Sequence, residues 1–222
     1  MVLLPVDGLA RYYGESRRRI LGLVSELDGK ELERQVPCCP AWSVRQLLAH
    51  LTASAEEALA GRLLGPPSDE ETAAQLAAFA GWPVDRLLEH WERLAASLQP
   101  QLAAASAWPL FLDVLAHEHD LRGALGKPGS RDEQAVELAA ERLLTWLRPP
   151  RAMVVLIGER QFSLGPEGEE AVLLRTTAFE AFRWRLGRRS RNQLLALDWS
   201  EDPKVLLDSL CVFGPAPSDI IE

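Results

Sequence analysis

The stretch Asp113-Val114-Leu115-Ala116-His117-Glu118-His119-Asp120 decides how this sequence is interpreted. Residues four apart lie on the same face of a helix, so Asp113 and His117 are expected side by side. Two ionisable groups that face a core need a partner inside the protein. The apolar residues that recur beside them at helical spacing are Leu110, Val114, Leu121 and Ala124.

A second histidine offers such a partner. His50 lies in another helical stretch, residues 44–51. Two neutral imidazoles and one carboxylate suit a catalytic divalent metal such as zinc and leave one coordination position open. A carboxylate and a histidine four residues apart also occur as an ordinary hydrogen bond on a helix surface. Spacing alone therefore leaves both interpretations open.

Length and composition limit the class of protein. A chain of 222 residues, 47% of them hydrophobic, can bury one large core or two smaller ones. A formal charge of −8 argues against binding to a nucleic-acid backbone. Three cysteines make no disulfide framework, and no basic leader or membrane-length apolar run is present. We expect a cytoplasmic monomer or homodimer with no nucleic-acid or membrane partner.

Capping signals and helical periodicity predict a helical N-terminal domain over residues 1–149. Asp7 can cap the first helix, and Gly126 can end the helix that carries His117. Pairs that fit a capping box are Ser43 with Gln46, Ser68 with Glu71, and Ser130 with Glu133. The helices are expected over about 7–27, 43–63, 68–98 with a break at 81–83, 106–125 starting near Ser106, and 130–148.

The period changes to that of strands after Pro149-Pro150, which predicts a small α/β domain over residues 150–222. A hairpin is expected about Gly158-Glu159. The order is strands over 153–157, 161–164 and 171–175, a helix over 177–187 capped by Thr177 with Glu180, a strand over 193–197 and a helix that opens at Pro203. The tail at 214–217 is expected to be loose.

The remaining histidines and the aspartate near His117 have simpler interpretations. His119 is turned about 200° round the helix from His117 and is expected to face solvent or a loop. His90 is expected to be structural. Asp120 lies one turn after His117 and can hold its imidazole as a second-shell acceptor, or form a salt bridge with Arg122.

Two further groups of residues stay open between a functional and a structural role. Cys38 and Cys39 precede the His50 helix, where the helix dipole would acidify a thiol, but they also fit as small buried hydrophobes. Their spacing does not favour a metal site. A basic cluster can bind a substrate carboxylate or can lie at a solvated helix end; it comprises Arg183, Arg185, Arg188, Arg189 and Arg191.

Residues 40–51, Pro40-Ala41-Trp42-Ser43-Val44-Arg45-Gln46-Leu47-Leu48-Ala49-His50-Leu51, resemble the mycothiol-dependent maleylpyruvate isomerase family, within the wider DinB-like metalloenzymes. Further stretches agree in the same order along nearly the whole chain. They are residues 113–117 with 120–122, then 124–126, and finally 186–190 before 197–199.

The resemblance implies an α+β protein with an N-terminal DinB-like four-helix bundle that carries the metal, followed by a small α/β domain. It implies that the metal ligands are His50, Asp113 and His117, with Trp42 and Asp120 around them. The family has glutamate where this chain has Asp113, which is one methylene shorter.

The resemblance also implies the chemistry. Zinc would bind a low-molecular-weight thiol, mycothiol, as its thiolate, which adds to a cis double bond; rotation and elimination then complete an isomerisation. Related members transfer the thiol to an electrophile instead. Arg188 or Arg189 would lie near a substrate carboxylate. The alternatives are a ligand-binding or regulatory module with a lapsed metal site, and a metal-dependent hydrolase that uses no thiol.

Overall fold

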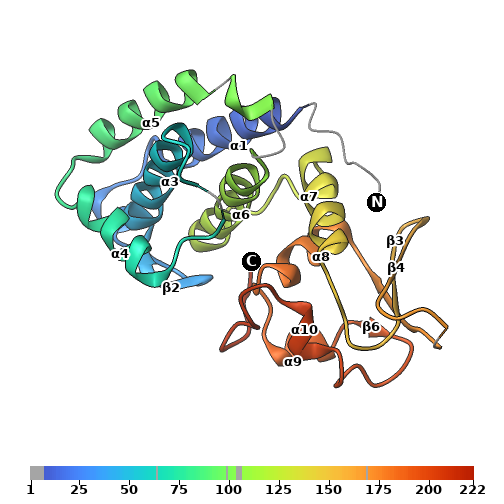
Figure 1. Cartoon of the computed structure of the whole chain (residues 1–222). Coiled ribbons are helices and arrows are strands. Elements are labelled where there is room, and N and C mark those ends of the chain that lie inside the picture. The colour runs from blue at the N-terminus through green and yellow to red at the C-terminus, as the bar shows by residue number, and fades with distance from the viewer. Residues whose placement is uncertain (1–7, 64, 99, 104–106, 169) are drawn as a thin grey trace. The chain divides into compact units, whose positions relative to one another are not determined.

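The computed structural model describes residues 8–63, 65–98, 100–103, 107–168 and 170–222, and combines helices with small sheets (Figure 1). The chain forms two compact units, one of residues up to Pro128 together with Glu222, the other Gly129–Ile221. No helix in the described part of the chain is long and apolar enough to cross a membrane.

The division between the units falls earlier than the sequence predicted. We expected a boundary at Pro149-Pro150, but the units divide after Pro128. The reason is that helix α7 (Gln134–Thr145) packs against α8 (Ala178–Arg185), so its apolar face belongs to the second core. The change from helical to strand period marks the end of α7, which lies inside the second unit.

The first unit is built on packed helices (Figure 1). Helix α3 packs against α5, α6 and α4, and α1 packs along α6. Helix α6 is buried on all sides from Val114 to Leu121. The elements are α1 (Leu9–Val24), α2 (Gly29–Leu32), α3 (Val44–Leu59), α4 (Asp69–Ala78), α5 (Val84–Leu98), a short 3₁₀ turn (Gln101–Ala103) and α6 (Trp108–Leu125).

The capping signals predict most helix ends correctly. Ser43 with Gln46 and Ser68 with Glu71 form the expected capping boxes at the starts of α3 and α4. Gly126 ends α6 in the left-handed conformation. The predicted cap at Asp7 and the predicted helix start at Ser106 lie outside the described residues.

The predicted capping box of Ser130 with Glu133 is wrong. Glu133 is itself the N-cap of α7, and its side chain makes no cap hydrogen bond. Ser130 has a φ of 54°, a left-handed conformation that belongs to the turn before the helix. The helix therefore begins three residues later than the motif suggests, at Gln134.

A short two-stranded ribbon, which the sequence analysis did not predict, precedes α3. Strands β1 (Gln35–Val36) and β2 (Cys39–Ser43) pair antiparallel, with Val36 opposite Cys39. Strand β2 runs directly into the Ser43 cap of α3. The ribbon therefore fixes Cys39 and Trp42 close to the helix that carries His50.

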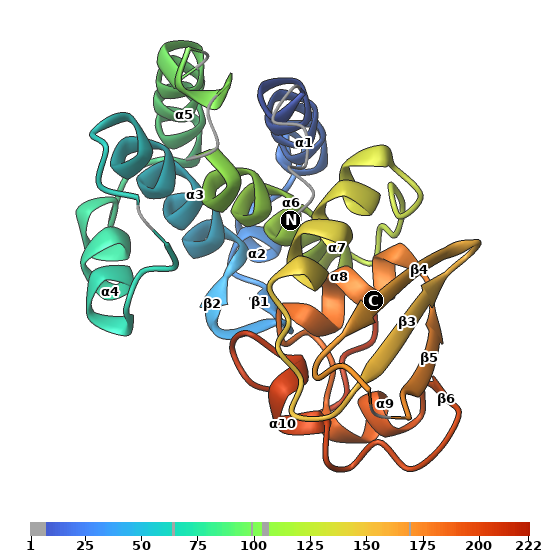
Figure 2. The same cartoon turned by 45° about the vertical axis from the view of Figure 1, so that its right-hand side comes forward.

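The second unit contains a sheet with the strand order β4-β3-β5-β6 (Figure 2). Strands β3 (Met153–Ile157) and β4 (Arg160–Leu164) form the predicted hairpin, and Gly158 supplies the positive φ that its turn needs. Strand β5 (Val172–Thr176) is parallel to β3, and β6 (Asp198–Trp199) is antiparallel to β5.

Three predictions for the end of the chain are wrong. Residues 193–197 are not a strand, because Ser190 and Gln193 form a capping box that starts helix α9 (Arg191–Leu195). The last helix, α10 (Leu207–Leu210), begins after Pro203 rather than at it. The tail is held in place, since the Ala216 N–H donates to the carbonyl of Arg189 at 2.9 Å.

The side chain of Thr177 accepts from the Glu180 N–H and so caps α8 as predicted, but the reciprocal half of that capping box is absent among the described contacts. The Glu180 carboxylate instead accepts from the guanidinium of Arg189, at 2.6 and 2.8 Å. This ion pair ties the turn after α8 to the first turn of α8 within the second unit.

A buried carboxylate joins α1 to α6 in the first unit. Glu118 is fully buried, and it accepts from Arg19 Nε at 2.8 Å and Nη2 at 2.9 Å and from Arg122 Nε at 3.0 Å. Arg122 thus pairs with Glu118. Because both arginines donate to this buried carboxylate, its neutralisation removes negative charge that compensates theirs.

The variant Glu118→Gln is expected to lose about 3 to 5 kcal/mol of unfolding free energy in urea denaturation, since it keeps the side-chain volume but breaks a buried charge cluster. The matched control is Glu57→Gln, whose pair with Arg62 lies at the surface, and which should change stability far less. Equal losses in the two variants would contradict this account of the α1–α6 contact.

A second buried polar contact joins α1 to α5. The indole Nε1 of Trp91 donates to the hydroxyl of Tyr13 at 2.9 Å, and both side chains are buried. Burial raises the pKa of Tyr13 from its ordinary 10.0 to about 12, although the bond from Trp91 and the charge of Arg17 oppose the shift. The folded state therefore favours the protonated phenol.

This shift predicts a loss of stability at high pH. The contribution of Tyr13 is complete below the ordinary pKa of 10.0 and falls as the pH rises towards about 12, because only the unfolded chain ionises freely in that range. Unfolding free energies measured over this range should fall more steeply for the wild type than for Tyr13→Phe. Parallel curves for the two proteins would show that Tyr13 is not responsible.

Candidate metal site

The structure brings together the three side chains that the sequence singled out. His50 comes from α3, and Asp113 and His117 come from α6. The Nε2 atoms of His50 and His117 lie 3.2 and 3.4 Å from the same atom, Oδ1 of Asp113. Both imidazoles are buried, while the Asp113 side chain is 21% exposed. Asp113 is thus the most exposed of the three side chains.

The outer nitrogen of each imidazole faces an oxygen acceptor. His50 Nδ1 lies 3.1 Å from Oε1 of Gln75, and His117 Nδ1 lies 2.9 Å from Oδ2 of Asp120. Each Nδ1 therefore carries a hydrogen and donates it, which leaves the lone pair of a neutral ring on Nε2. Both lone pairs then point towards Asp113, the arrangement found around metal-binding histidines.

The electrostatics of the cluster favour a positive charge at its centre. Burial acts to raise the pKa of Asp113, but His50 and His117 together bring it well below its ordinary value. Burial acts to lower the pKa of His117, but the hydrogen bonds to Asp113 and Asp120 and the contact with Cys39 raise it well above its ordinary value. A proton or a metal ion can supply that positive charge.

The spacing of the three donor atoms fits a metal ion. Ligand atoms at zinc bond lengths of about 2.0 to 2.2 Å and tetrahedral angles lie roughly 3.4 Å apart. The two observed separations from Asp113 Oδ1, 3.2 and 3.4 Å, match that value. In addition, Oδ2 of Asp113 is buried and has no hydrogen-bond partner among the described residues. The shorter aspartate side chain therefore reaches both histidines.

Trp42 packs against both imidazoles. Its ring centroid lies 4.8 Å from that of His50 and 5.8 Å from that of His117, with tilted planes. The two imidazoles meet edge to face, with centroids 5.1 Å apart. Strand β2, which carries Trp42, thus limits how far either ring can turn.

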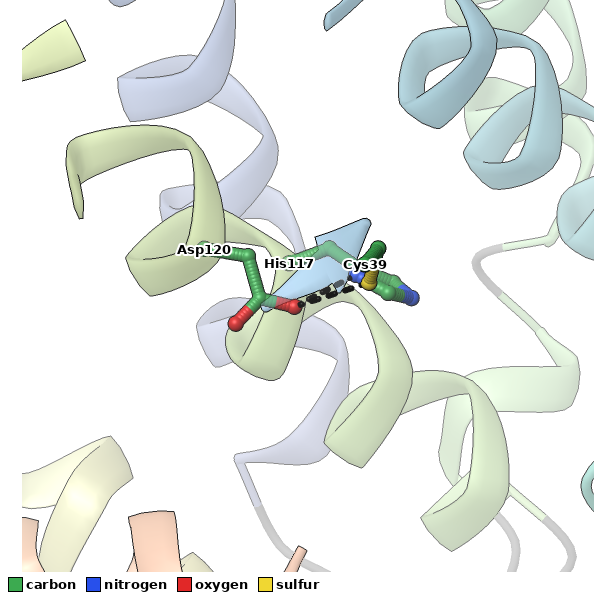
Figure 3. Close-up of side chains that lie close together, drawn as sticks. All are labelled: Cys39, His117 and Asp120. Carbon is green, nitrogen blue, oxygen red and sulfur yellow. Dashed lines mark hydrogen bonds and ion pairs between the residues drawn. The ribbon is translucent and has the colours of Figure 1, made fainter. Parts of the chain in front are cut away.

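Two residues near the cluster were missed as site residues by the sequence analysis. Gln75, on α4, accepts a hydrogen bond from His50, and no sequence motif indicates Gln75. Cys39, which we did not favour as a ligand, has its Sγ 3.7 Å from Oδ2 of Asp120. Figure 3 shows Cys39, His117 and Asp120 gathered at one point. The one sequence signal for Cys39 is that it lies three residues before Trp42, in the stretch that leads into the His50 helix.

The remaining candidate residues lie elsewhere. His119 was expected to face solvent or a loop. It is buried, so it does not face solvent, because α6 is enclosed on all sides here. A loop contact stays a prediction. His90 contacts Glu56 at 2.6 Å and stacks near Trp82, as a structural residue would.

The two candidate substrate arginines belong to the second unit, and both are engaged there. Arg189 is buried and paired with Glu180, while Nη1 of Arg188 donates to the carbonyl of Leu186 at 2.7 Å. A substrate carboxylate would compete with these partners. Their role in substrate binding stays a prediction.

Comparison with known proteins finds a family model that matches part of the first unit. Residues 13–61 match the mycothiol maleylpyruvate isomerase N-terminal domain, a segment that includes Trp42 and His50. No curated protein matches the chain by sequence.

Two solved structures resemble the fold. One is the crystal structure of the mycothiol-dependent maleylpyruvate isomerase, with a TM-score of 0.58 and 16% sequence identity over 90% of this chain and 94% of that one. The other is a point mutant of that isomerase, with the same TM-score and coverage and 15% identity. Residues 13–61 are therefore similar to the mycothiol maleylpyruvate isomerase N-terminal domain, and the chain shares the fold of that isomerase.

Proposed function

We propose that this protein is a metal-dependent enzyme that uses a low-molecular-weight thiol to isomerise, or to transfer sulfur to, a small electrophilic substrate. The observation that carries the proposal is the convergence of two imidazole Nε2 atoms on one carboxylate oxygen, at 3.2 and 3.4 Å. The match to the isomerase domain and the shared fold support it.

His50, Asp113 and His117 would hold the metal, for which zinc is the proposed identity. Nitrogen and oxygen donors suit zinc, and three protein ligands leave one position open for a thiol. When bound there, a divalent metal would lower the pKa of that thiol and hold it as the nucleophilic thiolate. Mycothiol is the proposed thiol, because the related isomerase depends on it.

The surrounding residues would prepare the ligands. Gln75 and Asp120 accept the Nδ1 hydrogens and so keep both Nε2 lone pairs available. Trp42 packs on both rings and restricts their rotation. These contacts would hold the donor atoms in place before a metal arrives. We also propose that α1, α3, α5 and α6 together form a DinB-like four-helix bundle.

In the proposed isomerisation, the sulfur forms a bond to one carbon of a cis double bond in the substrate. Rotation about the resulting single bond changes the geometry, and cleavage of the carbon–sulfur bond restores the double bond and the thiol. In the alternative transfer reaction, the carbon–sulfur bond is kept: either the electron pair of the double bond takes up the proton released by the thiol, or a leaving group departs from the attacked carbon with its bonding electrons. A carboxylate on the substrate would make contact with Arg188 or Arg189, as the family resemblance predicts.

The geometry does not favour a lapsed metal site. A carboxylate too short to reach both imidazoles would leave one of them without a partner in the cluster, but Asp113 lies within 3.4 Å of both. Two buried imidazoles and one carboxylate retained at ligand spacing are costly unless a cation completes them. This supports the enzyme over a regulatory module.

Metal analysis after zinc loading and dialysis is expected to find about one zinc per chain in the wild type. His50→Ala and Asp113→Asn should lose most of it, because each removes one donor. The matched control is His90→Ala, which removes a histidine bonded to Glu56 and should keep the zinc. A wild type that takes up no divalent metal, or a His90 variant that loses it, would contradict the proposal.

The outer contacts predict a smaller effect. Gln75→Leu and Asp120→Asn should each weaken zinc binding by roughly 10- to 100-fold, because an imidazole loses the acceptor that fixes its tautomer. Competition with a chromophoric chelator measures the change. Unaltered affinity in both variants would show that these contacts do not prepare the site.

Thermal unfolding tests whether a thiol is a cosubstrate. Zinc should raise the melting temperature of the wild type, and mycothiol should raise it further only when zinc is present. A shift with mycothiol in His50→Ala equal to that of the wild type would place the thiol elsewhere. Stabilisation by zinc without any effect of mycothiol would favour the hydrolase.

A further inference from the structure

We infer that Cys39, Nδ1 of His117 and Asp120 form a second site, for a thiophilic metal cation, which competes with the first site for His117. This inference goes beyond the proposed function and does not require that the protein react with a thiol. The three donor atoms lie within 4.8 Å of one another (Figure 3). Imidazole and carboxylate come from α6, and the thiol comes from β2.

The distances approach those of a bound cation. Cys39 Sγ lies 3.7 Å from Asp120 Oδ2, and His117 Nδ1 lies 2.9 Å from the same oxygen. At zinc bond lengths, sulfur and oxygen ligands on a tetrahedral centre are roughly 3.6 Å apart and nitrogen and oxygen ligands roughly 3.4 Å. The distance from the sulfur to the Asp120 oxygen therefore already matches, and the hydrogen-bonded edge between His117 and Asp120 would need to open slightly.

The surroundings also suit a cation. The Asp120 side chain is fully buried and the His117 side chain is 6% exposed, while Cys39 is half-buried and forms the accessible side of the group. A buried carboxylate requires compensation by positive charge. In the structure His117 Nδ1–H donates to it, and a metal ion could take the place of that hydrogen.

A thiol changes which metal the second site prefers. Thiolate selects soft cations, whereas the nitrogen and oxygen donors of the first site are harder. Binding at the second site would release the proton of the Cys39 thiol and the proton on His117 Nδ1. Cadmium is therefore a suitable probe, because it is soft and its bond to a thiolate absorbs in the ultraviolet.

The shared imidazole makes the two sites antagonistic. The first site uses Nε2 of His117 and depends on the hydrogen that Nδ1 donates to Asp120. A cation at Nδ1 removes that hydrogen and places a second positive charge on the other side of the same ring. A soft metal in excess is thus expected to weaken binding at the first site.

The test titrates the metal-free protein with cadmium and follows the thiolate absorption. The wild type should develop the band, and Cys39→Ser should lose it. Cys38→Ser is the matched control, because it removes the neighbouring thiol and should keep the band. Asp120→Asn should require at least roughly tenfold more cadmium to reach half of the full absorption. His50→Ala disables the first site alone and should still develop the band, which separates this inference from the proposed function.

Absence of the band in the wild type, its persistence in Cys39→Ser, or its loss in Cys38→Ser would overturn the second site. Loss of the band in His50→Ala would also overturn it, since the group would then not bind metal independently. None of these results would alter the zinc stoichiometry expected at His50, Asp113 and His117.

Discussion

The first unit depends on one electrostatic constraint, which is a carboxylate oxygen of Asp113 held against two buried imidazoles. Such a cluster is stable only if positive charge lies at its centre. In the absence of a metal, the raised pKa of His117 and the lowered pKa of Asp113 show that a proton meets part of that need. A metal ion in place of that proton would meet it more completely, because both Nε2 atoms already point inwards.

The packing of the helices keeps this cluster in place. Helix α6 carries Asp113, His117 and Asp120 on consecutive turns, and it is enclosed by α1, α3 and the β1–β2 ribbon. The buried Glu118 clamps the same helix to α1 through Arg19. A helix restrained in this way cannot easily turn its ligands away from α3. Glu118, which holds α6 against α1, therefore directly follows His117, which belongs to the metal cluster.

The sequence predicted the parts of the site that depend on local spacing. Asp113 with His117 and His117 with Asp120 follow from helical geometry, and His50 followed from the resemblance around Trp42. Gln75 and Cys39 could not be found in this way, because tertiary packing of α4 and β2 brings them to the histidines. Capping motifs predicted the helix starts correctly at Ser43 and Ser68. They failed at Ser130, which occupies a turn, and were overlooked at Ser190, where a strand over residues 193–197 was predicted instead.

X-ray absorption at the zinc edge tests the central claim most directly. With one equivalent of zinc and no added thiol, the account predicts about two imidazole nitrogens and additional oxygen at about 2.0 to 2.2 Å and no sulfur. Addition of mycothiol should then introduce one sulfur at about 2.3 Å. Sulfur that persists in the thiol-free spectrum of Cys39→Ser, or a spectrum without imidazole, would contradict a first site formed by His50, Asp113 and His117.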